Sequence, residues 1–87
     1  MPAPAPRLPV FTRDLTLVEK QKLLIVVNRM FGRGGDTIRA NALPEGMGLV
    51  ESGLTKGMLF KYLDERAENG YVTVTGTEFE RVWRLIR

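Results

Sequence analysis

Cysteine and histidine are both absent from this 87-residue chain, and their absence excludes several kinds of chemistry. Without cysteine there is no disulfide and no thiolate metal site, and the composition fits a reducing cytoplasm, where we expect the protein to reside. Without histidine the chain lacks the usual general base, a common zinc ligand and both the Ser-His and Cys-His nucleophile pairs. We therefore expect no enzyme, no metal site and no cofactor.

Long hydrophobic runs are also missing. The longest apolar run, residues 23–27, is far shorter than the roughly 20 residues that span a bilayer, so no membrane association is expected. The opening MPAPAPRLPV lacks the apolar core of a signal peptide, which predicts no export signal. Because residues 1–13 hold four of the five prolines, they are predicted to form an extended Pro/Ala-rich arm, followed by one folded domain over residues 14–87.

The remaining composition is that of an ordinary globular protein, with 44% apolar and 26% charged residues. The net charge of +3 gives a mild bias toward anionic partners. Arginine supplies most of the 13 basic residues, and its planar guanidinium suits phosphate and carboxylate contacts.

The first helix is predicted to begin at a capping box, TLVE, residues 16–19, and to end at Gly32. Its buried face is predicted from apolar residues at helical spacing, namely Leu17, Leu23, Leu24, Val27, Met30 and Phe31. The GRGGD stretch that follows lacks the frame of a phosphate-binding loop and is interpreted as a turn. A short extended piece is expected over residues 37–39.

Two more helices are predicted downstream. The shorter, residues 44–52, rests on Pro44 as a first helical residue and Gly53 as an exit, although glycines at 46 and 48 each cost about 1 kcal/mol relative to alanine. The longer begins after the cap Thr55 and closes at Asn69-Gly70.

Strict alternation of valine and threonine then predicts a strand over residues 71–75. The chain turns near Gly76, and a second strand is expected over residues 79–86 with Phe79, Trp83 and Leu85 on one side. The predicted order of helix, short strand, helix, glycine turn, helix and hairpin is the winged-helix arrangement.

The stretch LTKGMLFKYLDERAENGYVTVTG, residues 54–76, resembles the part of winged-helix regulators in which the recognition helix ends in a charged stretch and a glycine and runs into the first wing strand. The resemblance covers roughly residues 15–87. It implies a small α+β winged helix, with three helices and a C-terminal two-stranded β-hairpin wing. It also implies a bacterial, phage or plasmid transcription regulator that binds duplex DNA, usually as a homodimer on two-fold sites.

In such a regulator the 55–69 helix would lie in the major groove, and the wing tip would be Thr75, Gly76 and Thr77. The DNA-binding residues that the resemblance implies are Thr55, Lys56, Phe60, Lys61, Arg81 and Arg84.

Two features depart from that pattern. The helix face with Gly57, Lys61, Asp64 and Glu68 carries more negative than positive charge, and carboxylates near phosphate weaken binding. The wing tip, TGTE, has no basic residue. The alternative is therefore a winged-helix protein-interaction module, such as a phage-encoded inhibitor or adaptor that docks on a host complex.

Three aromatic residues have two interpretations each. Phe60 either packs in the core beneath residues 40–50 or is exposed as an anchor for a protein partner. Trp83 and Tyr71 either belong to the core or form a stacking platform for single-stranded nucleic acid, and the core is favoured. The pair Glu78 and Glu80 is interpreted as a solvated strand edge rather than a catalytic dyad.

Overall fold

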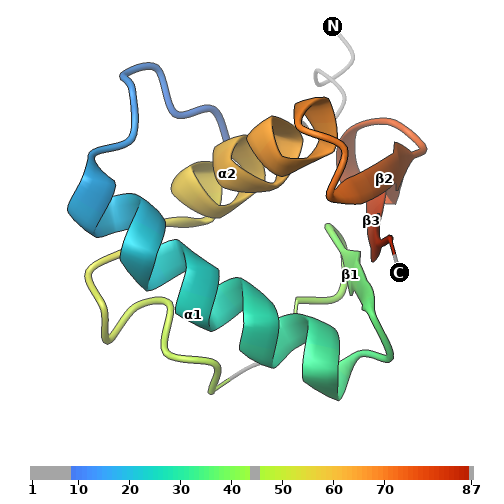
Figure 1. Cartoon of the computed structure of the whole chain (residues 1–87), viewed down its shortest axis with the longest axis horizontal. Coiled ribbons are helices and arrows are strands. Elements are labelled where there is room, and N and C mark those ends of the chain that lie inside the picture. Colours follow the sequence, from blue (N-terminus) through green and yellow to red (C-terminus); the bar gives the residue numbers. More distant parts are fainter. Residues whose placement is uncertain (1–8, 44–45, 87) are drawn as a thin grey trace, which may run out of the picture.

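The structure is a computed structural model that describes residues 9–43 and 46–86 (Figure 1). Two α-helices and three strands follow one another in the order α1 (Leu17–Arg33), β1 (Thr37–Arg39), α2 (Lys56–Glu68), β2 (Val72–Thr75) and β3 (Val82–Leu85), with a 3-10 turn, η1 (Glu78–Glu80), before the last strand. The expected α+β class is therefore confirmed.

Helix α1 begins as the capping box predicts. The Thr16 hydroxyl accepts the Glu19 backbone N–H at 3.2 Å, and the Glu19 carboxylate accepts the Thr16 N–H at 2.9 Å. The helix continues to Arg33 and is capped by Gly34, whose N–H donates to the Met30 carbonyl. The predicted end at Gly32 was therefore one residue too early.

The buried face of α1 is rotated from the predicted one. Val26 is buried, whereas Leu17 and Leu24, both assigned to the core from the sequence, are exposed. The residues that do face the core are Leu23, Val26, Val27, Met30 and Phe31. Apolar residues surround this helix, so helical spacing alone does not identify the side that packs inward.

The predicted helix over residues 44–52 is wrong for the part that the structure describes. Residues 46–53 form consecutive turns, and Gly46, Gly48 and Gly53 all have positive φ angles of 74° to 88°. A left-handed backbone cannot continue a right-handed helix, and glycine adopts it without steric cost. Pro44 lies outside the described residues.

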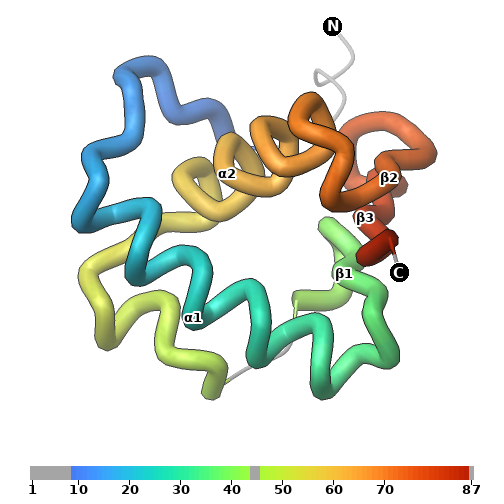
Figure 2. Tube along the Cα trace, viewed as in Figure 1, coloured from blue at the N-terminus to red at the C-terminus, as the bar shows by residue number. Residues whose placement is uncertain are grey.

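The sheet has three antiparallel strands in the order β1-β3-β2, one more than the predicted hairpin. The expected extended piece at residues 37–39 is confirmed as β1. It pairs with β3 on the side opposite β2 (Figure 2). Ile38, Trp83 and Val74 form one cross-strand row. Strand β1, which directly follows α1, thus pairs with the hairpin at the far end of the chain.

The last strand is shorter than predicted. Gly76 and Glu78 both have positive φ, and the chain forms the 3-10 turn η1 before β3 begins at Val82. Phe79 lies in this turn and is exposed, so its predicted place beside Trp83 is wrong.

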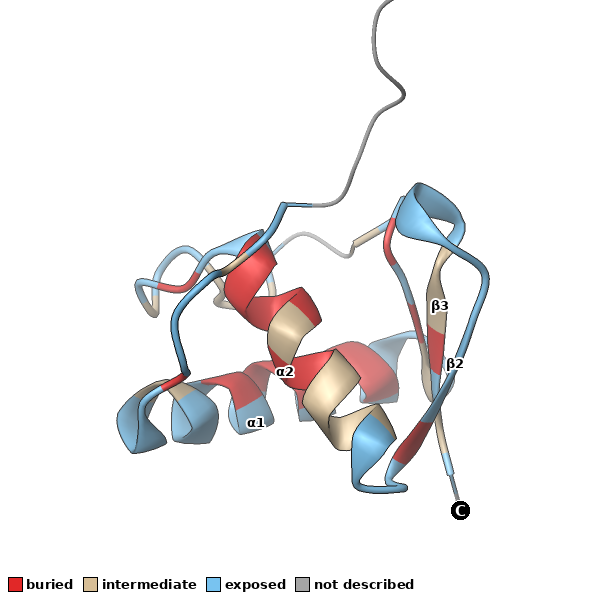
Figure 3. Cartoon of the chain, turned by 90° about the horizontal axis from the view of Figure 1, so that it is seen from above, coloured by how far each residue is buried: buried red, intermediate tan, exposed pale blue. Residues whose placement is uncertain are grey.

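The core lies where the two helices meet the inner face of the sheet (Figure 3). Trp83 is completely buried, which confirms its core assignment, whereas Tyr71 is exposed. Phe60 is also buried, and its ring stacks on Trp83 with centroids 5.4 Å apart and planes 10° apart. The core interpretation of Phe60 is therefore correct, and the exposed-anchor interpretation is wrong.

Candidate interaction surfaces

The segment of residues 9–14 covers the N-terminal half of α2. A Cβ placed on Gly57 would lie 3.5 Å from the Phe11 Cβ, so the segment passes directly over this glycine. The Lys61 ammonium donates to the Arg13 carbonyl at 2.8 Å and lies 5.9 Å from the centre of the Phe11 ring. The side of α2 that a recognition helix would present to DNA is thus occupied by the protein's own chain.

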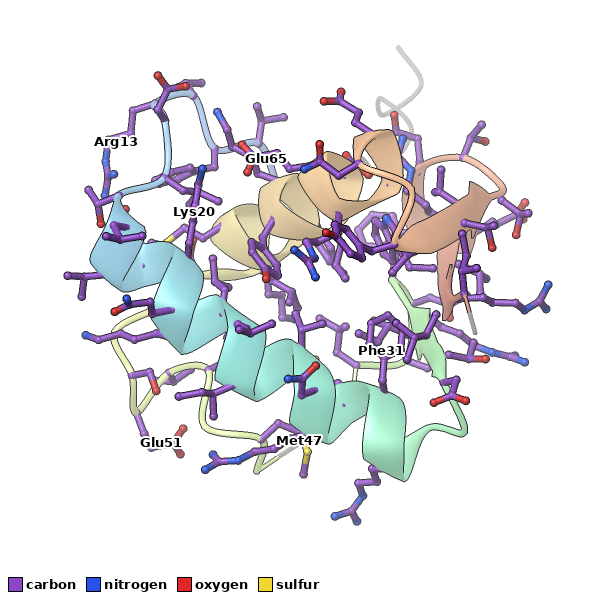
Figure 4. The ribbon with its side chains drawn as sticks, in the orientation of Figure 1. Arg13, Lys20, Phe31, Met47, Glu51 and Glu65 are labelled. Atoms are coloured by element: carbon purple, nitrogen blue, oxygen red, sulfur yellow. The ribbon has the colours of Figure 1, made fainter. Side chains whose placement is uncertain are left out.

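This covering segment is also fastened to the start of α1 (Figure 4). The Arg13 guanidinium donates to both oxygens of Glu19, at 2.8 and 2.6 Å. This bidentate contact, reinforced by the Thr16 N–H, lowers the pKa of Glu19 to about 2. One residue therefore caps α1 and holds the segment in place.

An acidic groove of about 490 Å³ runs along α2 beside the covering segment. Among the described residues, its charged lining consists of five carboxylates and two basic side chains, namely Asp14, Asp64, Glu65, Glu68, Glu78, Lys61 and Arg81. Lys61 is engaged by the segment, and Arg81 is paired with Asp64 at 3.2 Å. Such a surface repels phosphate.

The structure separates the six residues that the sequence implicated in DNA binding. Thr55 serves as the cap of α2, its hydroxyl accepting the Met58 N–H, and Lys56 is exposed beside it. Phe60, Lys61 and Arg81 are engaged within the protein as described above. Arg84 is exposed on β3, on the outer side of the sheet. The turn at residues 75–77, which the sequence predicted to be a wing tip, is exposed and continues into η1, which adds Glu78 and Glu80.

Exposed aliphatic side chains gather on the outer face of α1, which carries four of the ten large hydrophobic residues that are exposed among the described residues. Leu17, Val18, Leu24 and Ile25 are 71%, 58%, 41% and 54% exposed. The spacing of a helix places them on one side together with Gln21 and Asn28, which are also exposed. This outer face of α1 therefore carries no charge over three turns, whereas solvated helix faces are usually charged. Sequence reasoning missed it because Leu17 and Leu24 were assigned to the core.

Basic residues border this face on both sides. Lys22 and Arg29 follow one edge, where the Lys22 ammonium donates to the Ser52 carbonyl at 3.4 Å. Lys20 lies on the other edge and points toward Glu65 of α2, 3.8 Å away (Figure 4). The only carboxylate on α1, Glu19, is already held by Arg13. The outer face of α1 is therefore apolar in the middle and positive at its edges.

No family model, curated protein or solved structure matches the chain. Among residues 9–43 and 46–86 no helix is long and apolar enough to cross a bilayer. In that same part of the chain no three potential ligands gather closely enough to hold a metal ion.

Proposed function

We propose that this chain is a small protein-interaction module that binds a partner protein through the outer face of α1. The observation that carries the proposal is the uncharged row of exposed aliphatic side chains on that face. Burying such side chains against a partner contributes roughly 25 cal/mol per Å² of apolar area before the costs of association are subtracted.

A relationship to winged-helix domains is part of this proposal. Its supports are the helix-strand-helix-hairpin order and the central position of β3 between β1 and β2. The segment that would hold the second helix consists of turns over residues 46–53. Winged-helix architecture serves several functions, so the function has to be inferred from the chemistry of the exposed surface.

The surface of the 55–69 helix and the wing gives little support to duplex DNA binding, the first hypothesis from the sequence. That helix presents an acidic groove under residues 9–14, and the wing tip leads into two glutamates. The protein-interaction alternative gains support, but from α1 instead of Phe60, which is buried.

The charges bordering α1 favour an acidic amphipathic helix as the partner element. A second copy of this chain is disfavoured, because an antiparallel two-fold pairing would place Lys22 and Arg29 against the same edge of the other copy. A bilayer surface is disfavoured because Gln21 and Asn28 in the middle of the face would lose water without gaining hydrogen-bond partners. A protein can supply those partners.

Affinity capture from an extract of the cells that naturally express the protein tests the proposal. The full chain is compared with the double variant Val18→Asp/Ile25→Asp and with Val50→Asp, a control at an aliphatic residue that is 80% exposed outside α1. We expect the specific partner to be lost with the double variant and kept with the control. Charge reversal by Lys22→Glu/Arg29→Glu should also weaken capture.

These substitutions are at exposed positions, so the free energies of unfolding should stay within about 0.5 kcal/mol of that of the unmodified protein. Capture of identical proteins by the unmodified chain and the double variant would refute the proposal. Sedimentation of the purified chain checks the second-copy alternative, and binding to anionic phosphatidylglycerol vesicles checks the membrane alternative.

A further inference from the structure

The outer side of the sheet presents a different chemistry from the outer face of α1. Residues paired across antiparallel strands point to the same side, and the row of Ile38, Trp83 and Val74 faces the helices. The alternate residues therefore face outward, in two rows given by the register. These rows are Thr37, Arg84 and Thr73, and then Arg39, Val82 and Thr75.

This outer sheet face contains two arginines and no carboxylate. Arg39 and Arg84 are diagonal neighbours on adjacent strands, a relationship that separates the residues by about 7–8 Å. Neither arginine forms a salt bridge or side-chain hydrogen bond with another described residue, in contrast to Arg13 and Arg81. Two exposed positive charges side by side without a counter-charge attract an anion.

A hollow of about 360 Å³ lies along the open edge of β1, next to this face. It is lined by Arg33 from the last turn of α1, by Thr37 and Arg39, and by three residues without charged side chains. Among the described residues of this lining there is no carboxylate. Arg33 therefore adds a third guanidinium to this region, and it shares the hollow with Arg39.

The backbone of β1 adds donors at the same edge. The Leu85 N–H donates to the Asp36 carbonyl, and the Ala40 N–H donates to the Arg81 carbonyl, so residues 36 and 40 face β3. Polar groups alternate in direction along an antiparallel strand, so Ile38 also faces β3, whereas Thr37 and Arg39 turn their polar groups the other way. The N–H groups of Thr37 and Arg39 consequently point toward the hollow.

We propose that this surface binds the phosphate backbone of duplex DNA, with Arg33, Arg39 and Arg84 as the charged contacts and Thr37 and Thr73 as hydroxyl donors. Guanidinium groups bind phosphate oxygens in a bidentate manner, and threonine hydroxyls commonly contact them. Duplex is favoured over single-stranded nucleic acid because the two outward rows contain no aromatic side chain on which a base could stack. The exposed Tyr71 lies just before β2, and the Arg66 guanidinium covers one face of its ring at 3.9 Å.

This inference goes beyond the proposed function, since it uses another face of the molecule and another class of partner. It also places the DNA contacts away from α2. The partner-binding face of α1 would remain available while the sheet contacts DNA.

Fluorescence anisotropy of a labelled mixed-sequence 20-bp duplex, titrated with the full chain at about 50 and 200 mM salt, tests the inference. Three phosphate contacts predict that the dissociation constant rises about 40-fold between these salt concentrations. The variant Arg39→Ala/Arg84→Ala should weaken binding at least about tenfold at the lower salt and reduce the log-log salt slope by about 2. Lys56→Ala, at the start of α2, is the matched control and should change neither.

Several results would overturn the inference. One is an absence of duplex binding at the lower salt, and another is weakening by Lys56→Ala but not by the double arginine variant. Equal or tighter binding of the single strand of the same sequence would point to stacking instead. Complete competition by about 10 mM inorganic phosphate at constant ionic strength would mean that the hollow binds a small phosphorylated ligand rather than DNA. Unchanged circular dichroism and thermal midpoints of the variants ensure that any loss is one of binding.

Discussion

Asp64 on α2 accepts the indole N–H of Trp83 at 3.1 Å through one carboxylate oxygen and the Arg81 guanidinium at 3.2 Å through the other. Trp83 is the completely buried centre of β3, and its N–H is a donor that needs a partner. A carboxylate that the sequence placed on a groove-facing surface thus connects helix α2 to the sheet.

Replacing this carboxylate should cost stability. We expect Asp64→Ala to lower the free energy of unfolding by about 1–3 kcal/mol, because a buried donor loses its acceptor. Asp64→Asn keeps an oxygen that can accept the indole N–H and should lose less. Urea denaturation measures both, and Glu68→Ala, one turn later and exposed, is the control. Equal effects of Asp64→Ala and Glu68→Ala would show that the bond to Trp83 contributes nothing.

Phe60 provides a second test of the core. Because its ring is buried against Trp83, Phe60→Ala should lower the free energy of unfolding by about 3–5 kcal/mol. Phe60→Leu, which fills more of the volume, should cost distinctly less. Thermal and urea unfolding of the two variants give the comparison. A stable, cooperatively folding Phe60→Ala protein would contradict the packing described here.

Local signals in the sequence predicted the local parts of the fold. The capping box at Thr16, the cap at Thr55 and the glycine exit at Gly70 all act within a few residues, and each is present in the structure. The strand at residues 72–75 followed from its alternation of residue types in the same way. Such signals need no knowledge of the rest of the chain.

Features that depend on distant contacts could not be predicted in this way. Lys61 bonds to Arg13, 48 positions away in the chain, and this contact covers the face of α2 that looked available. The burial of Phe60 likewise depends on where Trp83 lies. On α1, Leu24 and Val26 are equally apolar, and only the packing of α2 and the sheet decides that Val26 is the buried one.

The pair of Arg13 and Glu19 predicts a pH dependence. The pKa of Glu19 is lowered from its ordinary value of 4.5 to about 2, first by the Arg13 hydrogen bond and then by the Thr16 N–H. A carboxylate with a lowered pKa in the folded state stabilises the fold above about pH 4.5, and that contribution is lost as the pH falls toward 2.

We therefore expect the thermal midpoint of the unmodified protein to be higher than that of Glu19→Gln at neutral pH. This difference should shrink as the pH falls from 4.5 to 2. Thermal scans from pH 2 to 7 measure this difference. Glu51→Gln, at an exposed carboxylate without a bonded partner among the described residues, is the control and should show no such trend. A constant difference over the whole range would mean that the Arg13 contact does not persist in solution.

Replacing two of the glycines by alanine should change the free energy of unfolding in opposite directions. At Gly57 a new Cβ would meet the Val10 carbonyl carbon at 3.4 Å and the Phe11 Cβ at 3.5 Å, which are ordinary van der Waals distances. Alanine also favours a helix over glycine, so Gly57→Ala should raise the free energy of unfolding by about 0.5–1 kcal/mol.

At Gly34 the same methyl group would overlap the Thr37 carbonyl oxygen, although the φ of −94° is one that alanine readily adopts. The clash lies where α1 turns into β1, and it forces the strand away from the helix. Gly34→Ala should therefore lower the free energy of unfolding by at least about 1 kcal/mol. Urea midpoints with unchanged m-values test both variants. If Gly57→Ala proved as destabilising as Gly34→Ala, residues 9–14 would have to press on α2 more tightly than these distances indicate.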